Sequence, residues 1–294
     1  MTRLTVPPPF AAATAAREGD AGRRWVKSLP DLAAEFLERW SCPVSGPVLH
    51  GFVGLVVPAV RADGTEVALK LGFPSPVNTA EPVALAAWQG NGAARLLERD
   101  DNRFAMLLER LQPLAKPDPA PFTTVGRLAR RLAIPAPPGL PSLADKALGW
   151  NLPGHAKRLG SPLPARIIDA AVAGVRDLAA ECQTTLLHGD LHFGNIMRSH
   201  DEPRVIDPDG LAGDPEFELL PVLRGDWPAV TAEVSLRQAV NRRIAEFAAA
   251  AEVDRERVRR WTQARAAESA LWSRHLREPA AVTAVVDTLA ALLV

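Results

Sequence analysis

The spacing of hydrophobic positions predicts a helix near the start of the chain. Residues 28–40 (SLPDLAAEFLERW) repeat apolar side chains at helical intervals, and Ser28 stands where a helix N-cap is expected. The apolar residues of one face are Leu32, Phe36, Leu37 and Trp40. Residues 1–27 contain a triple proline followed by small residues, so we expect an ordinary tail there and no signal peptide.

A strand-like pattern follows, with one helix inserted. Four runs rich in β-branched and other large apolar residues predict strands at 48–60, 67–71, 94–100 and 104–111. Asp63-Gly64 predicts a hairpin turn between the first two runs, and Asp100-Asp101-Asn102 predicts another between the last two. Between the pairs, residues 81–89 return to helical spacing.

A proline-rich segment separates this part from the rest of the chain. Residues 113–141 hold eight prolines, at positions 113, 117, 119, 121, 135, 137, 138 and 141. Because proline stiffens linkers and ends helices, we expect a domain boundary here, with an N-terminal lobe at 1–112 and a C-terminal lobe at 113–294. The run LARRLAI between the prolines still allows a short helix.

The C-terminal lobe reads as mainly helical. Residues 166–182 have clean helical periodicity, and the chain from about 232 onward is helical and rich in Ala and Arg. The face predicted to be buried in 166–182 is Ile168, Val172, Val175 and Ala179. The expected fold class is therefore α+β, with a β-rich N-terminal lobe and a helical C-terminal lobe.

Composition excludes several classes of protein. The 34 basic and 34 acidic residues cancel, whereas a dedicated nucleic-acid binder normally carries a basic excess. No run approaches the roughly 20 apolar residues of a membrane span. Only Cys42 and Cys182 are present, so a disulfide scaffold is not expected, and both are assigned to packing in a cytoplasmic protein.

The segment with the clearest chemistry is LLHGDLHFGNIMRSHDEPRVIDPDG, residues 186–210. It predicts a hairpin with Asp190 and Asn195 on the entry loop and Asp207 at the exit, so that two carboxylates and an amide converge. Such oxygen ligands suit Mg²⁺ shared with substrate phosphates, and a second carboxylate can accept a proton from a hydroxyl. His188 is expected to brace the loop through a backbone carbonyl; a zinc pair with His192 is disfavoured because no third ligand follows.

This arrangement is what phosphoryl transfer from ATP needs. Asp190 would orient the acceptor hydroxyl and take its proton, while Asn195 and Asp207 would hold Mg²⁺ against the ATP phosphates. The same chemistry asks for a lysine on an N-lobe strand and an acidic partner on the next helix, and Lys70 and Glu81 stand at those positions.

HGDLHFGN followed by VIDPDG resembles the aminoglycoside phosphotransferase branch of the protein-kinase-like fold, over residues 40–275. Within it, the supporting segments are similar to the streptomycin 6-phosphotransferase and hydroxyurea phosphotransferase group. The resemblance implies the roles given above and adds an adenine-binding hinge at Glu109 to Leu111. One departure stands out: the glycine-rich phosphate loop keeps only Gly51 and Gly54.

The acceptor is expected to be a small molecule with a hydroxyl group, and the motifs leave its identity open. The resemblance implies that carboxylates after Asp207 help to form its site: Asp209, Glu216, Glu218 and Asp226. Residues 201–226 hold eight acids against two arginines, and this net charge of −6 favours a cationic acceptor such as a streptomycin-like aminocyclitol. It is balanced by +6 over residues 123–167.

Two alternatives remain. The acceptor could be hydroxyurea or another small metabolite alcohol, which the motifs cannot separate from an aminoglycoside. The chain could also be a nucleotide-binding module without transfer activity, although the full set of site residues argues against that. No protein partner is implied, and the tryptophans at 227, 261 and 272 are assigned to packing.

Overall fold

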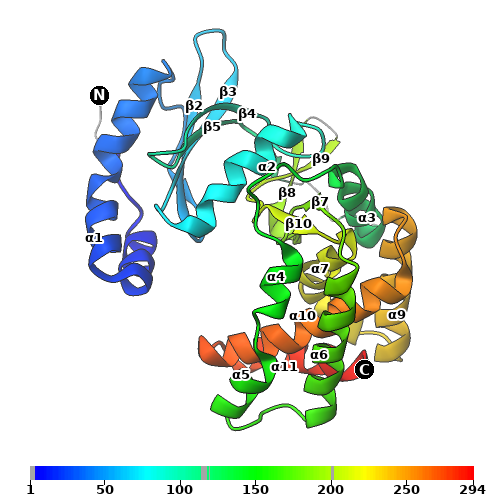
Figure 1. The fold of residues 1–294 in the computed structure, drawn as a ribbon. Helices are drawn as coiled ribbons and strands as arrows, with labels where there is room; N and C mark the ends of the chain where they lie inside the picture. Colours follow the sequence, from blue (N-terminus) through cyan, green and yellow to red (C-terminus); the bar gives the residue numbers. More distant parts are fainter. Residues whose placement is uncertain (1–3, 114–117, 119, 200–201) are drawn as a thin grey trace. The chain divides into compact units, whose positions relative to one another are not determined.

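The computed structural model describes residues 4–113, 118, 120–199 and 202–294 (Figure 1). The chain divides into two compact units, Met1–Gln112 and Pro113–Val294. Three positions used in the sequence arguments, Pro117, Pro119 and Asp201, lie outside the described residues.

The N-terminal unit contains an antiparallel sheet with strand order β1-β2-β3-β5-β4. Its strands are β1 (Leu49–His50), β2 (Gly54–Val60), β3 (Glu66–Gly72), β4 (Leu96–Asp100) and β5 (Ala105–Glu109). The turn between β2 and β3 is closed by the Thr65 N–H, which donates to Asp63 Oδ1 at 2.9 Å, and Gly64 has the left-handed φ of +86° that glycine tolerates. Both predicted hairpins are confirmed.

Alternation along the strands separates two faces of this sheet. Leu69 and Leu71 of β3 belong to a buried apolar cluster that β2, β5 and α1 (Pro8–Arg39) share. Successive side chains of a strand point to opposite faces, so Lys70 points the other way, as does Met106, its partner in register on β5. Figure 1 shows α1 and α2 (Ala80–Trp88) on opposite sides of the sheet.

The N-terminal helix is much longer than the sequence predicted. α1 spans 32 residues, and only Gly19, with non-helical φ and ψ, interrupts it. Phe10 and Trp25 are buried against one another with ring centroids 5.9 Å apart. The expected tail at 1–27 is therefore wrong for Pro8 onward, because its few large apolar side chains are buried by packing. Ser28 is not an N-cap; its hydroxyl donates to the Trp25 carbonyl.

The C-terminal unit is mainly helical, as expected. Its helices are α3 (Pro121–Leu132), α4 (Leu143–Leu148), α5 (Leu152–Arg158), α6 (Ala165–Ala180), α7 (Leu219–Gly225), α8 (Trp227–Thr231), α9 (Leu236–Ala251), α10 (Arg255–His275) and α11 (Ala280–Leu292). α10 packs against both α6 and α11, and α3 packs against α9. The last pair comes so close that a Cβ at Gly126 would lie 2.7 Å from the Phe247 carbonyl oxygen.

The predicted helix at 166–182 is confirmed, but its buried face is rotated. Val172 is 40% exposed, and the buried residues of α6 are Ile167, Ile168, Ala171, Gly174, Val175 and Leu178. The tryptophans also differ from one another: Trp261 is fully buried, whereas Trp272 is 48% exposed and stacks on His275. Trp272 is therefore not a core residue, and it packs on the surface against His275.

Short strands frame the segment of this unit that carries Asp190, Asn195 and Asp207. They are β7 (Thr185–Leu187), β8 (Ile196–Ser199), β9 (Glu202–Val205) and β10 (Leu211–Gly213), with β6 (Gln112–Pro113) at the unit boundary. β8 pairs antiparallel with β9, which confirms the predicted hairpin, and β7 pairs antiparallel with β10. The chain thus leaves β7, passes through residues 188–195 and the β8–β9 hairpin, and returns to β7 in its partner strand β10.

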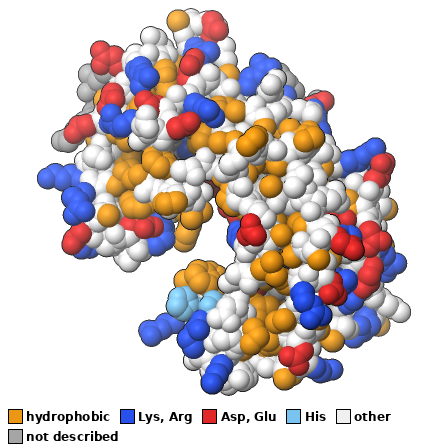
Figure 2. All heavy atoms as spheres, in the orientation of Figure 1, with side chains coloured by type: hydrophobic (Ala, Val, Ile, Leu, Met, Phe, Trp, Pro, Cys, Tyr) orange, Lys and Arg blue, Asp and Glu red, His pale blue; other side chains and the backbone are white. Residues whose placement is uncertain are grey.

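The structure also bears on membrane-spanning helices and on the distribution of surface charge. Within the described part of the chain, no helix combines the length and apolar character needed to cross a membrane. On the face visible in Figure 2, acidic and basic side chains are interspersed over each unit. The balanced composition of the chain thus appears on this face as a mixture of both charges.

Candidate active site

The loop after β7 is organised around a buried histidine. His188 Nε2 lies 2.9 Å from the Ile206 carbonyl oxygen, and its Nδ1 accepts the Asp190 backbone N–H at 3.2 Å. These contacts assign the ring proton to Nε2, and burial lowers the pKa of the imidazole, which favours the neutral form. The prediction that His188 braces the loop through a backbone carbonyl is confirmed.

The peptide groups of Gly189 are held from two sides. Its N–H donates to Glu218 at 3.0 and 3.2 Å, and its carbonyl accepts from Arg265 Nη2 at 2.7 Å. Arg265 in turn stacks over the Phe217 ring at 4.1 Å. Gly189 has φ of +86°, and a Cβ there would lie 2.8 Å from the Asp209 Cβ, so glycine is required on two counts.

Hydrogen bonds also connect Asp190 with Asn195, and Asn195 with the residue that precedes Asp207. Asn195 Nδ2 donates to the Asp190 backbone carbonyl at 3.0 Å, and the Ile206 N–H donates to the Asn195 carbonyl at 3.0 Å. Asp207 follows with a left-handed φ of +59°. The loop and the hairpin exit are therefore joined, as the sequence predicted.

The Asp190 carboxylate remains accessible within this fixed loop. Its side chain is 46% exposed, and Oδ2 lies 3.6 Å from His192 Nε2. It lines a hollow of about 740 Å³ in the C-terminal unit. The walls are the loop at His192–Gly194, the end of α7 with the start of α8, and the first turns of α11.

Asn195 and Asp207 supply oxygen donors that suit a hard cation. Since Nδ2 of Asn195 donates to the loop, its Oδ1 is the atom that would bind Mg²⁺ beside the Asp207 carboxylate. Among the described residues, no three His, Cys, Asp or Glu side chains gather into a metal site. A cation here would complete its coordination with water and phosphate oxygens, as Mg²⁺ commonly does.

In the N-terminal unit, Lys70 and Glu81 form the pair expected from their spacing. Lys70 Nζ donates to both carboxylate oxygens of Glu81, at 2.6 and 2.7 Å, and each side chain is 9% exposed. Both line a hollow of about 140 Å³ together with Val53, Gly72 and Phe104. The carboxylate therefore neutralises and orients the ammonium group in a largely desolvated place.

The other N-terminal predictions fall on the sheet's loops and edge. Gly51 N–H donates to the Gly54 carbonyl at 2.9 Å, which closes the turn into β2. Glu109, at the end of β5, accepts the Arg95 N–H at 2.8 Å through Oε1, and Leu111 follows it partly exposed. An adenine-binding role for Glu109 to Leu111 stays a prediction.

The acids expected near the acceptor are engaged elsewhere. Glu216 is buried and lies 3.9 Å from Arg257; Glu218 is buried against Gly189; Asp226 forms an ion pair with Arg243 at 2.7 Å. Asp209 is 42% exposed, with Lys146 3.8 Å away. None of the four is among the described residues that line the hollow at Asp190.

Several residues of this hollow were not singled out from the sequence as site residues. They are Arg224, Trp227, Pro228, Ala281, Val282 and Val285. Trp227 had been assigned to packing, and the α11 residues belong to an Ala/Val-rich helix that carries no chemical motif. Only the tertiary fold brings α11 to the loop that holds Asp190.

A family model described as aminoglycoside/hydroxyurea antibiotic resistance kinase matches residues 39–276 of the chain. The chain belongs to this family. The resemblance drawn from the Asp190 and Asp207 motifs is confirmed, and the protein is an ATP-dependent phosphotransferase.

Two curated relatives of this kinase illustrate the range of the family. The hydroxyurea phosphotransferase of Kitasatospora aureofaciens is 44% identical over 86% of this chain and 76% of its own length. The streptomycin 6-kinase of Streptomyces glaucescens is 36% identical over 95% of both chains. Both identities lie well above the level at which a shared fold is in doubt.

Solved structures agree on the fold of this kinase. A choline/ethanolamine kinase family protein from Mesorhizobium loti superposes with a TM-score of 0.59 at 18% identity, covering 89% of this chain and 93% of its own. At that identity the match speaks for the architecture alone. The predicted two-lobed α+β protein-kinase-like fold is confirmed.

Proposed function

We propose that this kinase transfers the γ-phosphoryl group of ATP to a hydroxyl of a small-molecule antibiotic, with Asp190 as the catalytic base. The observation that carries the proposal is the contrast within the loop at 188–195. Its backbone is fixed by buried groups, whereas the Asp190 carboxylate is half exposed and lines a hollow of about 740 Å³. A carboxylate presented in this way can orient a hydroxyl and accept its proton.

The other predicted residues would serve the nucleotide. Lys70, oriented by Glu81, would bind the α- and β-phosphates, and the backbone at Glu109 to Leu111 would bind adenine. Asn195 and Asp207 would hold Mg²⁺ through one amide and one carboxylate oxygen. When bound, the cation neutralises charge that develops on the transferring phosphoryl group.

Two acceptor classes follow from the relatives, whose names include a streptomycin 6-kinase and a hydroxyurea phosphotransferase. An aminoglycoside or aminocyclitol is the acceptor favoured by the acidic segment at 201–226. Hydroxyurea is favoured by a different observation: Asp190 is the only acid among the described residues that line the hollow. The reading as a nucleotide-binding module without transfer activity is disfavoured, because the lysine, base and metal-ligand positions are all kept.

An acceptor screen tests the proposal directly. Formation of ADP is measured with aminoglycosides, hydroxyurea and common metabolite alcohols, each with wild type and with Asp190→Asn. We expect acceptor-dependent ADP formation in wild type and its loss in Asp190→Asn. If no acceptor stimulates ADP formation, or if the variant keeps wild-type turnover, the proposed function is wrong.

A further inference from the structure

Arg224 stands at an unusual place in the C-terminal unit. It lies in the last turn of α7 and lines the hollow that also holds Asp190. Its side chain is partly buried, yet within the described part of the chain its guanidinium makes no hydrogen bond and no ion pair of 4 Å or less. Burial raises the pKa of Glu268 on α10, and the charge of Arg224 partly opposes that rise, but no ion pair between the two is present among the described residues.

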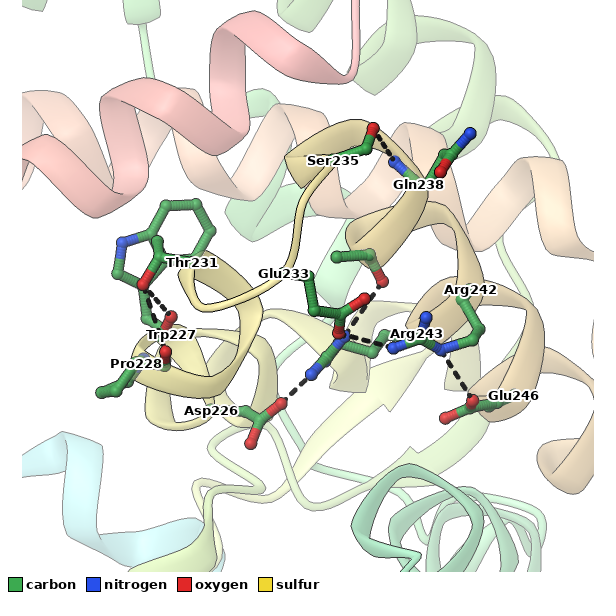
Figure 3. Close-up of polar contacts among 11 residues, drawn as sticks. Asp226, Trp227, Pro228, Thr231, Glu233, Ser235, Gln238, Arg242, Arg243 and Glu246 are labelled. Atoms are coloured by element: carbon green, nitrogen blue, oxygen red, sulfur yellow. Dashed lines mark hydrogen bonds and ion pairs between the residues drawn. The ribbon is translucent and has the colours of Figure 1, made fainter.

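Several other buried or partly buried arginines of this unit have carboxylate partners. Arg243 donates to Asp226 at 2.7 Å and to Glu233 at 2.6 Å, and Figure 3 shows the Asp226 carboxylate turned toward Arg243. Arg257 pairs with Asp214. Arg265 donates instead to the Phe217 and Gly189 carbonyls. Arg224 differs from these arginines in having neither a carboxylate nor a carbonyl partner among the described residues, so its N–H donors are available to a ligand in the hollow.

The charge of the hollow differs from the charge of the sequence around it. Its formally charged lining residues are Asp190 and Arg224, with His192 beside them; the rest are apolar side chains and glycines. Asp226, two residues after Arg224 in the sequence, is directed away to Arg243, and Trp227 does not face that ion pair (Figure 3). A polycation entering here would meet one carboxylate together with one guanidinium of its own sign.

We propose that Arg224 binds an oxygen of the acceptor, and that it selects compact acceptors carrying a carbonyl or similar oxygen near the reactive hydroxyl over polycations. This assignment rests on the proposed function, since it concerns the same acceptor site. A guanidinium offers several N–H donors in a planar fork, which matches a carbonyl or a carboxylate. Hydroxyurea has this chemistry, with a hydroxyl on nitrogen next to a urea carbonyl.

The apolar walls fit such an acceptor as well. Trp227, Val282 and Val285 offer surface for the uncharged part of a small molecule, but no acceptor for extra ammonium or guanidinium groups. Repulsion between Arg224 and a cationic acceptor would add to this selectivity, because like charges brought together at a binding site disfavour the complex.

Binding is measured by calorimetry on the full chain without ATP, using hydroxyurea and streptomycin as probes. We expect Arg224→Gln to weaken hydroxyurea binding about 10- to 100-fold, the loss typical of a hydrogen bond from a charged donor. Arg224→Lys should fall between wild type and Arg224→Gln, because it keeps the charge but loses the planar fork. Arg224→Glu should tighten streptomycin binding about tenfold by reversing the local charge.

The matched control is Arg166→Gln, an exposed arginine on α6 that is outside the hollow. It should leave both affinities as in wild type, and thermal melts check that each variant is folded. Should Arg224→Gln be unstable, the Arg224→Lys and Arg224→Glu comparisons decide the outcome. The inference is overturned if wild type binds streptomycin more tightly than hydroxyurea, if it binds neither, or if the Arg224 variants bind both as wild type does.

These readouts are independent of phosphoryl transfer. If the affinities follow the expected order but no acceptor is phosphorylated, the proposed function fails while the binding role of Arg224 stands. If transfer occurs and the Arg224 variants keep wild-type affinities, the proposed function stands and the role of Arg224 is wrong.

Discussion

The two units keep their functional groups in place by opposite means. In the N-terminal unit, Lys70 and Glu81 form a buried ion pair, so the Glu81 carboxylate both orients and neutralises the ammonium group. In the C-terminal unit, buried groups hold only the backbone around Asp190, and the carboxylate itself stays half exposed. Lys70, proposed to bind the ATP phosphates, can be paired in advance, whereas Asp190, proposed as the base, must remain open to its substrate.

This difference extends to the acids around each site. Glu81 pairs directly with Lys70, the side chain proposed to bind phosphate. Glu218 and Asp214 instead bind groups of the surrounding structure. Glu218 accepts from the Gly189 N–H, and Asp214 accepts from the Trp261 indole N–H at 2.8 Å. The acids of a segment can therefore stabilise the structure around a site without contacting the ligand.

The largest expected effect comes from the open carboxylate. Asp190→Asn removes the base while keeping the size of the side chain, and turnover should fall by about 10² to 10⁴-fold, the usual contribution of general base catalysis. Nucleotide affinity should be retained, which fluorescence titration with an ATP analogue measures. Asp169→Asn, on the exposed surface of α6, is the control. Turnover within twofold of wild type would remove Asp190 from the mechanism.

The predicted metal ligand should separate nucleotide binding from its Mg²⁺ dependence. Asp207 has a left-handed φ of +59°, which Asn tolerates, so Asp207→Asn should preserve the backbone. We expect Mg²⁺ to strengthen ATP binding in wild type and to have little effect in the variant. Calorimetry with and without Mg²⁺ measures this, and an unchanged Mg²⁺ effect would contradict the role of Asp207.

Breaking the ion pair between Lys70 and Glu81 tests how strongly each charge depends on the other for stability. Glu81→Gln leaves Lys70 buried without its carboxylate and should lower the free energy of unfolding by about 3 kcal/mol. The double variant Lys70→Met with Glu81→Leu removes both charges and should unfold within about 1 kcal/mol of wild type, yet bind ATP poorly. Urea denaturation compares the three proteins. Equal stability of Glu81→Gln and wild type would show that the pair is not coupled.

The smallest expected effect is a pH dependence of stability that arises from Glu218, the acid that holds the Gly189 backbone. Burial raises the pKa of Glu218 from 4.5 to about 7, so the native state binds its proton more tightly than the unfolded chain does. The resulting stabilisation is complete below pH 4.5 and is lost as the pH rises through 7, by roughly 1–3 kcal/mol. Relative to Glu218→Gln, wild type should therefore lose stability between pH 5 and 8 in urea titrations. Parallel pH profiles of the two proteins would refute the assignment.

Much of the fold could be predicted because its signals are local. The Asp63-Gly64 turn, the spacing of 81–89 and the hairpin ending at Asp207 each depend on a few neighbouring residues. The first half of α1 could not be predicted in this way, since Phe10 and Trp25 are too sparse to show a periodic stripe. They are helical because tertiary packing buries them, which the local pattern does not reveal.

The candidate site likewise contains residues that local motifs predict and contacts that only the tertiary fold forms. Lys70, Glu81, Asp190, Asn195 and Asp207 have fixed spacing in recognisable contexts, so their grouping within each unit could be predicted. The partners of the downstream acids could not, because Arg243, Arg257 and Arg265 come from distant helices. The local pattern of clustered acids predicts a negatively charged surface. In the structure, several of these acids instead pair with arginines that are distant in the sequence.

The covering of the sheet by α1 has a practical consequence for how this chain can be shortened. The family match begins at residue 39, but the apolar side of β3 is closed by Phe36, Leu32 and Leu29, which precede it. The family match therefore leaves out residues that close the apolar core of the N-terminal unit. A gene fragment that begins at residue 39 would still encode Lys70, Glu81 and Asp190, yet it would leave the apolar side of β3 exposed to water.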